Sequence, residues 1–314
     1  MAAIARPAAG SRPRRTRRAL VLVVVVVLVA AALVGRGLVW TPIPLLELAG
    51  VPPLAAPLRT PAQHDALYAQ GGELPFVVEC NGRSGQALVL GLAHTNDPAS
   101  AGIAALRTRL LEFGPTLVLV EGTGGWHFGG VASLVERHGE TGAAQALAQA
   151  IGARCRSLEP DPRAEVAHAI AAFGREKVLA FYFLRVFASD RDRAGAAWTP
   201  AQLESEAQRL LRKRGASTGL GDALPDVAAF DAFWRADGPA GQDWRTLPAE
   251  WLWRGNASSW LGAVAERINE YRDRHFVAGI AAGVAAGERV FAACGKSHAI
   301  LIEPALRAAV SAGK

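Results

Sequence analysis

Short apolar runs alternate with longer amphipathic segments along most of the chain. Residues 86–90 and 289–294 hold apolar, strand-like runs, and the continuous apolar run at 116–120 is typical of a strand that is buried on both faces. Apolar residues three and four positions apart predict helices, such as 129–152 and a long one from 258 to about 287. This alternation favours an α/β fold with a mainly parallel central sheet and flanking helices.

Several segments refine this picture. Residues 74–80 and 86–90 are joined by a short polar segment, which predicts a hairpin near the start of the sheet. Residues 161–188 suggest two helices divided near Gly174, and the Trp-rich residues 224–253 suggest a helical insert or lid. A closing helix is expected from Glu303.

The N-terminal region is organised differently. Residues 19–35 form an uninterrupted apolar stretch behind a cluster of arginines, which favours an uncleaved signal anchor over a cleaved signal peptide. The arginines should stay cytoplasmic, so the rest of the chain should lie on the outer side of the membrane. The expected organisation is a basic cytoplasmic tail (1–18), a transmembrane signal anchor (19–39), a Pro-rich linker (40–62) and an α/β domain (63–314).

Charge and cysteine content narrow the function. Residues 1–36 hold seven arginines and no acidic residue, so the formal charge of +6 leaves −1 for the remainder of the chain. A near-neutral domain removes the main compositional support for nucleic-acid binding. Cys80, Cys155 and Cys294 form no CxxC motif, which excludes a cysteine-rich zinc site. Buried, inert thiols are the favoured interpretation, and a disulfide between two of them is the alternative.

Two Gly-x-x-His motifs lie at opposite ends of the proposed domain. Gly91 to His94 and Gly295 to His298 each follow an apolar run, as Glu121 and Glu159 do. The carboxyl ends of strands in open α/β sheets are where ligands bind, so these side chains are expected to meet at one edge. Imidazole and carboxylate groups can ligate a divalent metal or act as a general base with its partner. Taken singly, each residue has an ordinary structural interpretation as a loop or capping residue.

The repeated motif also suggests an internal duplication, that is, two related halves.

Arg272 is expected to bind a substrate carboxylate or to orient Glu121, and the alternative interpretation of this residue is a solvated position on a helix. Asp273 has the same alternative.

These motifs together resemble the TraB/PrgY, GumN and Tiki superfamily, which is related to the ChaN and erythromycin-esterase folds. The resemblance covers roughly residues 74–306, and its carriers occur in a characteristic order. They are Gly91-Leu92-Ala93-His94, the run ending Val120-Glu121-Gly122, Leu158-Glu159, Arg272-Asp273-Arg274 and Gly295-Lys296-Ser297-His298. The resemblance implies an α/β fold with two related halves and one cleft, and metal-dependent proteolysis outside the membrane in the Tiki branch.

Carried onto this chain, the resemblance implies a set of roles. His94, Glu121 and His298 would bind a divalent ion of the Zn, Mn or Co class, and Glu159 would be a fourth ligand or the base. Arg272 would be a supporting or oxyanion-stabilising group, and metal-bound water would attack an amide or ester carbonyl.

The leading hypothesis is therefore a membrane-anchored, extracytoplasmic, metal-dependent hydrolase, most plausibly a peptidase acting on a peptide or a small ester or amide. One alternative is a non-catalytic protein that uses the same cleft to sequester a peptide, haem or other small ligand. Another is a metal-free esterase in which His94 and Glu121 activate water directly. No nucleic acid is expected as a partner, and the oligomeric state stays open.

Overall fold

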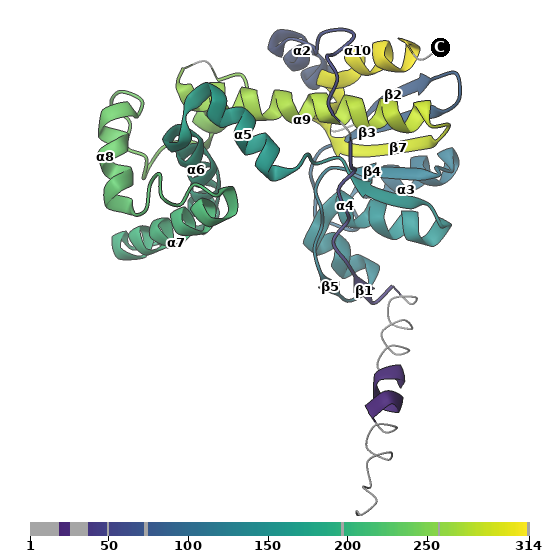
Figure 1. The fold of residues 1–314 in the computed structure, drawn as a ribbon, viewed down its shortest axis with the longest axis horizontal. Helices are drawn as coiled ribbons and strands as arrows, with labels where there is room; N and C mark the ends of the chain where they lie inside the picture. Colours follow the sequence, from purple (N-terminus) through teal and green to yellow (C-terminus); the bar gives the residue numbers. More distant parts are fainter. Residues whose placement is uncertain are drawn as a thin grey trace, which may run out of the picture.

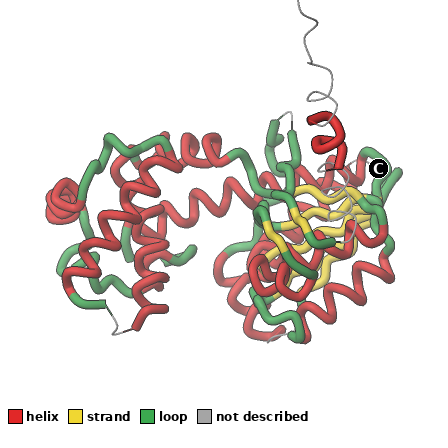
Figure 2. Tube along the Cα trace, turned by 90° about the horizontal axis from the view of Figure 1, so that it is seen from below, coloured by secondary structure: helices red, strands yellow, loops and turns green. Residues whose placement is uncertain are grey.

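A computed structural model describes residues 19–25, 37–48, 50–71, 75–195, 198–256 and 258–312. Figure 1 shows a sheet covered by helices and, to its left, a lobe built from helices. The described strands all lie in the region that contains the sheet, and the described part of the lobe holds helices and loops only (Figure 2). The predicted α/β class is confirmed.

Five strands form the main sheet, in the order β2-β3-β7-β4-β6. β2 and β3 form the predicted hairpin and pair antiparallel, whereas β3, β7, β4 and β6 pair parallel. Strands from opposite ends of the domain are therefore neighbours, and their carboxyl ends meet at one edge. The bounds are Phe76–Asn81 (β2), Gln86–Leu92 (β3), Arg289–Gly295 (β7), Leu117–Val120 (β4) and Arg154–Ser157 (β6).

Alternate side chains of the central strands enter two separate cores, as the pleat of a strand requires. On one face, Leu90 and Val120 pack in a core shared with α3 and α4. On the other face, Val89 and Leu119 pack in a core shared with α9 and α10. Burial on both faces explains why these strands are continuous apolar runs. The helices span Ala101–Phe113 (α3), Val131–Ile151 (α4), Trp260–Ala285 (α9) and Lys296–Ala312 (α10).

The closing helix begins earlier than expected. α10 starts at Lys296, directly after β7, and includes Pro304 in its interior. Proline cannot donate to the Ile300 carbonyl one turn earlier. The Arg59 guanidinium donates to that oxygen instead, at 2.7 Å. The expectation of a start at Glu303 was wrong because the contact that replaces the missing helical bond is distant in sequence.

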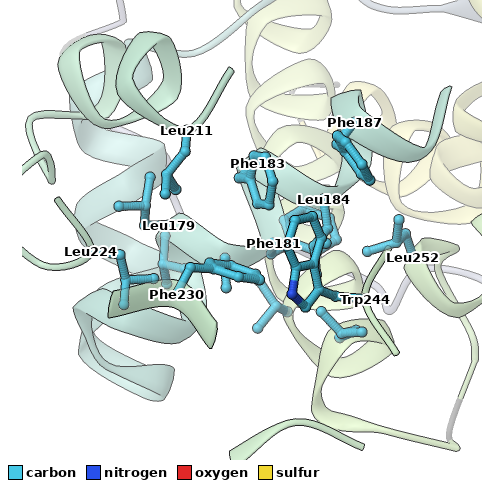
Figure 3. Close-up of a cluster of buried hydrophobic side chains, with 14 of the residues drawn as sticks. Leu179, Phe181, Phe183, Leu184, Phe187, Leu211, Leu224, Phe230, Trp244 and Leu252 are labelled. Atoms are coloured by element: carbon cyan, nitrogen blue, oxygen red, sulfur yellow. The ribbon is translucent and has the colours of Figure 1, made fainter. Parts of the chain in front are cut away.

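The helical lobe has its own core. Phe183 and Phe230 meet with ring centroids 4.9 Å apart, and the Trp244 ring lies 5.7 Å from Phe183 and 5.2 Å from Phe187 (Figure 3). The Trp-rich segment contributes α8 and a short 3-10 helix to this lobe. The lobe helices span Pro162–Phe173 (α5), Arg175–Ala194 (α6), Pro200–Thr218 (α7), Val227–Asp237 (α8) and Ala249–Leu252 (η2).

Helix α9 joins the two regions. Its early residues, including Leu261 and Ile268, belong to the core of the lobe. Its later residues, including Phe276 and Ile280, belong to the core beneath the sheet. Arg272 and Asp273 lie where the helix passes from one core to the other, and both are buried.

The predicted linker, residues 40–62, does not stand clear of the domain. Trp40 and Ile43 are buried, and the backbone of Leu46 donates to the Ser157 carbonyl at 2.8 Å. The segment around Leu46 covers the edge of β6, where unpaired backbone groups would otherwise be exposed. Two further elements flank it, β1 (Val39–Trp40) and α2 (Pro61–Gly71).

Most of the predicted anchor, 19–39, and all of the basic tail, 1–18, lie outside the described residues. Among the residues that are described, no helix has both the length and the apolar character needed to cross a bilayer.

The cysteines are free thiols, with Cys80 and Cys294 buried, which agrees with the favoured interpretation. Burial raises the pKa of the Cys155 thiol to about 12.

Candidate functional site

Three of the strand-end residues line one pocket. His94 follows β3, Glu121 follows β4, and His298 lies in the first turn of α10 after β7. The pocket has a volume of about 190 Å³ and is also lined by Tyr68 from α2 and Arg185 from α6. The helical lobe therefore contributes to the site.

The glycines of the two motifs allow close approach rather than a sharp turn. Both lie inside strands, and neither has a positive φ. A Cβ atom at Gly295 would lie 2.9 Å from His94 Nε2 and 3.2 Å from Glu121 Oε2. At Gly91 it would lie 2.5 Å from the Ala299 Cβ. A side chain at either position would therefore displace the site residues or the helix that carries His298.

Arg272 is the centre of the site. Its Nε donates to Glu159 at 3.0 Å, and its Nη2 donates to Glu159 at 2.6 Å and to Glu121 at 2.9 Å. Its Nη1 lies 3.4 Å from His298 Nε2 and 3.4 Å from the Asn269 side-chain oxygen. Glu159 is not among the described residues that line the pocket; it contributes by accepting hydrogen bonds from Arg272.

Glu121 is held as an anion. One of its oxygens accepts from Arg272, and the other accepts from the Gly295 backbone N–H at 2.6 Å. Burial alone would raise the pKa of Glu121, but the charge of His298 in its protonated form, the charge of Arg272 and the Gly295 hydrogen bond lower it to about 2. The carboxylates of Glu159 and Glu121 offset the effect of burial on Arg272 and raise the pKa of its guanidinium.

His298 is oriented by a buried carboxylate. Its Nδ1 lies 2.5 Å from Asp273 Oδ1, and the Asp273 side chain is 0 % exposed. The other Asp273 oxygen accepts from Arg254, which also forms two 3.0 Å hydrogen bonds with Glu266. The charge of Asp273 is therefore compensated, as a buried carboxylate requires.

His94 differs from His298 in its surroundings. Its side chain is 72 % exposed, and its Nδ1 lies 3.6 Å from a Glu140 oxygen. The carboxylate of Glu140, helped by that of Glu121, raises the pKa of His94. Glu140 also accepts from the Thr95 N–H at 2.6 Å, which fixes the loop after β3.

A break in α4 brings Glu140 to this loop. Gly139 has a φ of 54° inside the helix, and a Cβ atom there would lie 2.7 Å from the Thr95 carbonyl oxygen. Only glycine combines this backbone conformation with such a close approach.

The predicted metal ligands do not form a metal centre as they are arranged. The described residues contain no group of three or more His, Cys, Asp or Glu side chains placed to hold an ion. Both Glu121 oxygens already accept from N–H donors, and a permanent cation lies beside His298 Nε2. The donor set as arranged fits an imidazole–carboxylate–guanidinium network.

The structure places His94, Glu121, His298 and Arg272 at one pocket and leaves Glu159 outside it, and sequence reasoning missed several of their partners. The missed residues are Asp273 as the partner of His298, and Glu140, Asn269, Arg185 and Arg254. Only Asp273 gave a usable signal, because it adjoins Arg272 in the sequence. Comparison of the chain with protein-family models, curated proteins and solved structures finds no match. The family assignment remains a prediction.

Proposed function

We propose that this protein is a hydrolase of amide or ester bonds with peptides as its favoured substrates, and that His298 is its general base. The observation that carries the proposal is the pairing of His298 with the buried Asp273 at 2.5 Å, while His298 Nε2 faces the pocket. A base whose second nitrogen is held by a carboxylate is the arrangement that acid–base hydrolysis requires.

The partners of His298 assign its tautomer. An ionised Asp273 can accept hydrogen bonds but cannot donate them, so it takes the Nδ1–H. Arg272 can only donate, so it faces an Nε2 that carries no hydrogen. The contact between Arg272 Nη1 and this lone pair is long, at 3.4 Å, so a water in the pocket can displace it and give Nε2 a proton. The imidazolium that forms is stabilised by Asp273.

The remaining pocket residues supply positive potential. The pocket is lined by three cationic side chains, Arg185, Arg272 and Lys296, and by the carboxylate of Glu121. As water attacks a carbonyl carbon, negative charge develops on the carbonyl oxygen, and fixed cations in a partly buried site stabilise it. Arg272 acts here as a positioning residue, since Glu159, Glu121 and Asn269 engage its nitrogens.

A divalent-metal form of the same hydrolase is the second candidate. The meeting of His94, Glu121 and His298 at one pocket favours it. A bound ion would lower the pKa of water and polarise the scissile carbonyl. To ligate such an ion, Glu121 would have to exchange its bond with Arg272, which is why the metal-free form is proposed first.

The proposal includes membrane anchoring through residues 19–39, with the domain outside the cytoplasm. It is supported by exposed apolar side chains at the end of that segment and on or next to the strand that pairs with β1. Leu38 is 39 % exposed, Trp126 65 % and Phe128 74 %, and Phe128 pairs with Val39 between β5 (His127–Phe128) and β1. Tryptophan side chains, such as that of Trp126, are enriched at the membrane–water interface. A reporter fused after Lys314 that is active in the cytoplasm would contradict this topology.

We also propose that the two Gly-x-x-His units arose by duplication. β3 and β7 pair in parallel register, with Gly91 opposite Cys294 and Leu92 opposite Gly295. The second unit lacks a loop equivalent to residues 93–100, because α10 follows β7 directly. A crystal structure in which β3–α3 and β7–α10 do not superpose would argue against a common origin.

A substrate panel tests the function. The full chain in detergent is incubated with quenched peptides and activated esters, before and after treatment with a chelator. Hydrolysis that survives chelation, with no metal in the purified protein, is expected. Hydrolysis that is lost and then restored by Zn²⁺ or Mn²⁺ would favour the metal form. Binding of peptides without turnover of any substrate would favour a sequestering protein and contradict the proposal.

A further inference from the structure

A second histidine, His64, is paired with a serine at the edge of the same pocket. The Ser297 hydroxyl lies 3.1 Å from Nε2 of His64, a residue of α2 that is 233 positions earlier in the chain. Ser297 lines the pocket and is partly exposed, so its oxygen can be reached from the pocket. The mechanism proposed above uses neither residue.

The other nitrogen of His64 is also engaged. Its Nδ1 lies 2.9 Å from Asp65 Oδ1. The carboxylate takes the Nδ1–H, which leaves Nε2 to accept from the serine hydroxyl. Serine, imidazole and carboxylate thus follow one another at hydrogen-bond distance, which is the arrangement that activates a nucleophile. The Asp65 side chain is 78 % exposed, so its contribution should be the smallest of the three.

Helix α2 is tied to the helix that carries Ser297. The Arg59 backbone donates to the Leu301 carbonyl at 3.0 Å, and the Arg59 guanidinium pairs with Glu303 at 2.6 Å. At the start of α2, Thr60 and Gln63 exchange hydrogen bonds of 3.0 and 3.3 Å, which fixes the first turn. These bonds fix the start of α2, and with it the position of His64.

The pocket side of α2 is packed as well. The Tyr68 ring centroid lies 5.5 Å from that of His64, and Lys296 Nζ lies 4.9 Å above the Tyr68 ring. Tyr68 and Lys296 both line the pocket, so the positive charge of Lys296 is adjacent to the serine. A cation in the pocket that Ser297 lines would stabilise the negative charge that develops on the oxygen of an attacked carbonyl.

We propose that Ser297 is a nucleophile activated by His64, so that hydrolysis proceeds through an acyl-serine intermediate. This inference rests on the proposed hydrolase function and specifies its chemical course. The two histidines then have separate tasks, with His64 serving acylation and His298 serving deacylation.

The steps balance as follows. Ser297 Oγ forms a bond to the substrate carbonyl carbon while its proton passes to His64 Nε2. The bond to the leaving amine or alcohol breaks, and His64 returns the proton to that group. Water then gives a proton to His298 Nε2 and attacks the acyl carbon. The bond to Ser297 Oγ breaks, and the proton on His298 Nε2 passes to Ser297 Oγ, which restores both side chains. The products are a carboxylic acid and an amine or alcohol.

A fluorophosphonate probe tests the inference without a known substrate. Treated with this probe, the full chain should carry one covalent adduct, which peptide mapping assigns to Ser297. Ser297→Ala should abolish the adduct. His64→Gln should slow labelling by roughly 10²- to 10⁴-fold, the usual effect of losing a general base. Asp65→Asn should slow it less.

The chain offers a matched control. Ser133 also contacts a histidine, with its Oγ 2.7 Å from His127 Nε2, but Ser133 does not line the pocket. Ser133→Ala should label at the wild-type rate. Thermal melts that match the wild type establish that each variant is folded.

The outcomes separate this inference from the proposed function. A protein that hydrolyses the substrate panel but does not label at Ser297, or whose Ser297→Ala variant hydrolyses at the wild-type rate, overturns the inference and leaves the hydrolase intact. A protein that labels at Ser297 and hydrolyses nothing supports the nucleophile and overturns the proposed function.

Discussion

Asp273 and His298 face each other across two helices, with Oδ1 and Nδ1 2.5 Å apart. Asp273 lies on α9, where that helix passes from the core of the lobe to the core beneath the sheet. His298 lies in the first turn of α10, directly after the last strand. The pairing therefore ties the helical lobe, the sheet and the pocket together, and it aims Nε2 of the imidazole at the pocket.

The substitution Asp273→Asn should lower kcat by roughly 10²- to 10⁴-fold with a smaller effect on KM. An amide holds the imidazole less well and does not stabilise the imidazolium formed in the reaction. Glu266→Gln is the matched control. It removes the charge of Glu266, which pairs with the same Arg254 that pairs with Asp273, and it leaves the contact between Asp273 and His298 in place. Steady-state kinetics on a substrate from the panel checks this. A folded Asp273→Asn variant with wild-type kcat would show that the pairing is only structural.

Glu121 should make stability depend on pH in an acidic window. Its pKa is about 2 in the folded protein, below its ordinary value of 4.5. The stabilisation is therefore complete above pH 4.5 and is lost as the pH falls from 4.5 towards 2. The shift corresponds to roughly 3 kcal/mol. Urea unfolding of the wild type and of Glu121→Gln should give a free-energy difference that shrinks across that window. A difference that stays constant from pH 6 to pH 2.5 would mean that Glu121 is not held as an anion.

Arg272→Ala should destabilise the fold by roughly 3 to 5 kcal/mol, because it leaves Glu121 and Glu159 as uncompensated carboxylates in a largely buried site. Arg274→Ala is the control on the same helix. Arg274 pairs with Glu270 at 4.0 Å, and its side chain is 32 % exposed, so its loss should change stability by less than about 1 kcal/mol. Denaturant titration of both variants provides the comparison. Equal losses would mean that Arg272 is not the centre of the network.

The strands and the common edge of the sheet could be predicted from the sequence because they depend on local patterns. Apolar runs marked β3, β4 and β7, and His94, Glu121 and His298 lie within three residues of the ends of these strands. The start of α10 could not be predicted, because the Ile300 carbonyl that Pro304 leaves unbonded is satisfied by Arg59. Local composition contains no trace of that contact.

The partners of the site residues were hidden for the same reason. Glu140 reaches the loop after β3 only because α4 breaks at Gly139, and a glycine inside a helical pattern does not reveal a left-handed φ. His64 meets Ser297 only once a segment before the sheet has folded back onto the last helix. Proline content suggested that this segment was a linker, whereas buried Trp40 and Ile43 hold its first part to the domain.

The exposed apolar side chains near β1 and β5 should lie in the membrane interface. Trp126 should be quenched when the full chain is reconstituted into vesicles of brominated phosphatidylcholine. Trp126→Phe should reduce the quenched fraction of tryptophan fluorescence. Trp253→Phe removes a tryptophan of similar exposure, 64 %, on the helical lobe and should leave the quenched fraction unchanged. Quenching that is equally reduced by both substitutions would contradict a specific interfacial position.

The most direct measurement of the central claim is the hydrolytic rate of His298→Ala beside that of His94→Ala, on the best substrate of the panel and in folded protein. His298 is held by Asp273, whereas His94 is exposed at the mouth of the pocket. The account predicts that His298→Ala loses roughly 10²- to 10⁴-fold in kcat and that His94→Ala loses far less. Wild-type activity in His298→Ala, or a larger loss in His94→Ala, would contradict it.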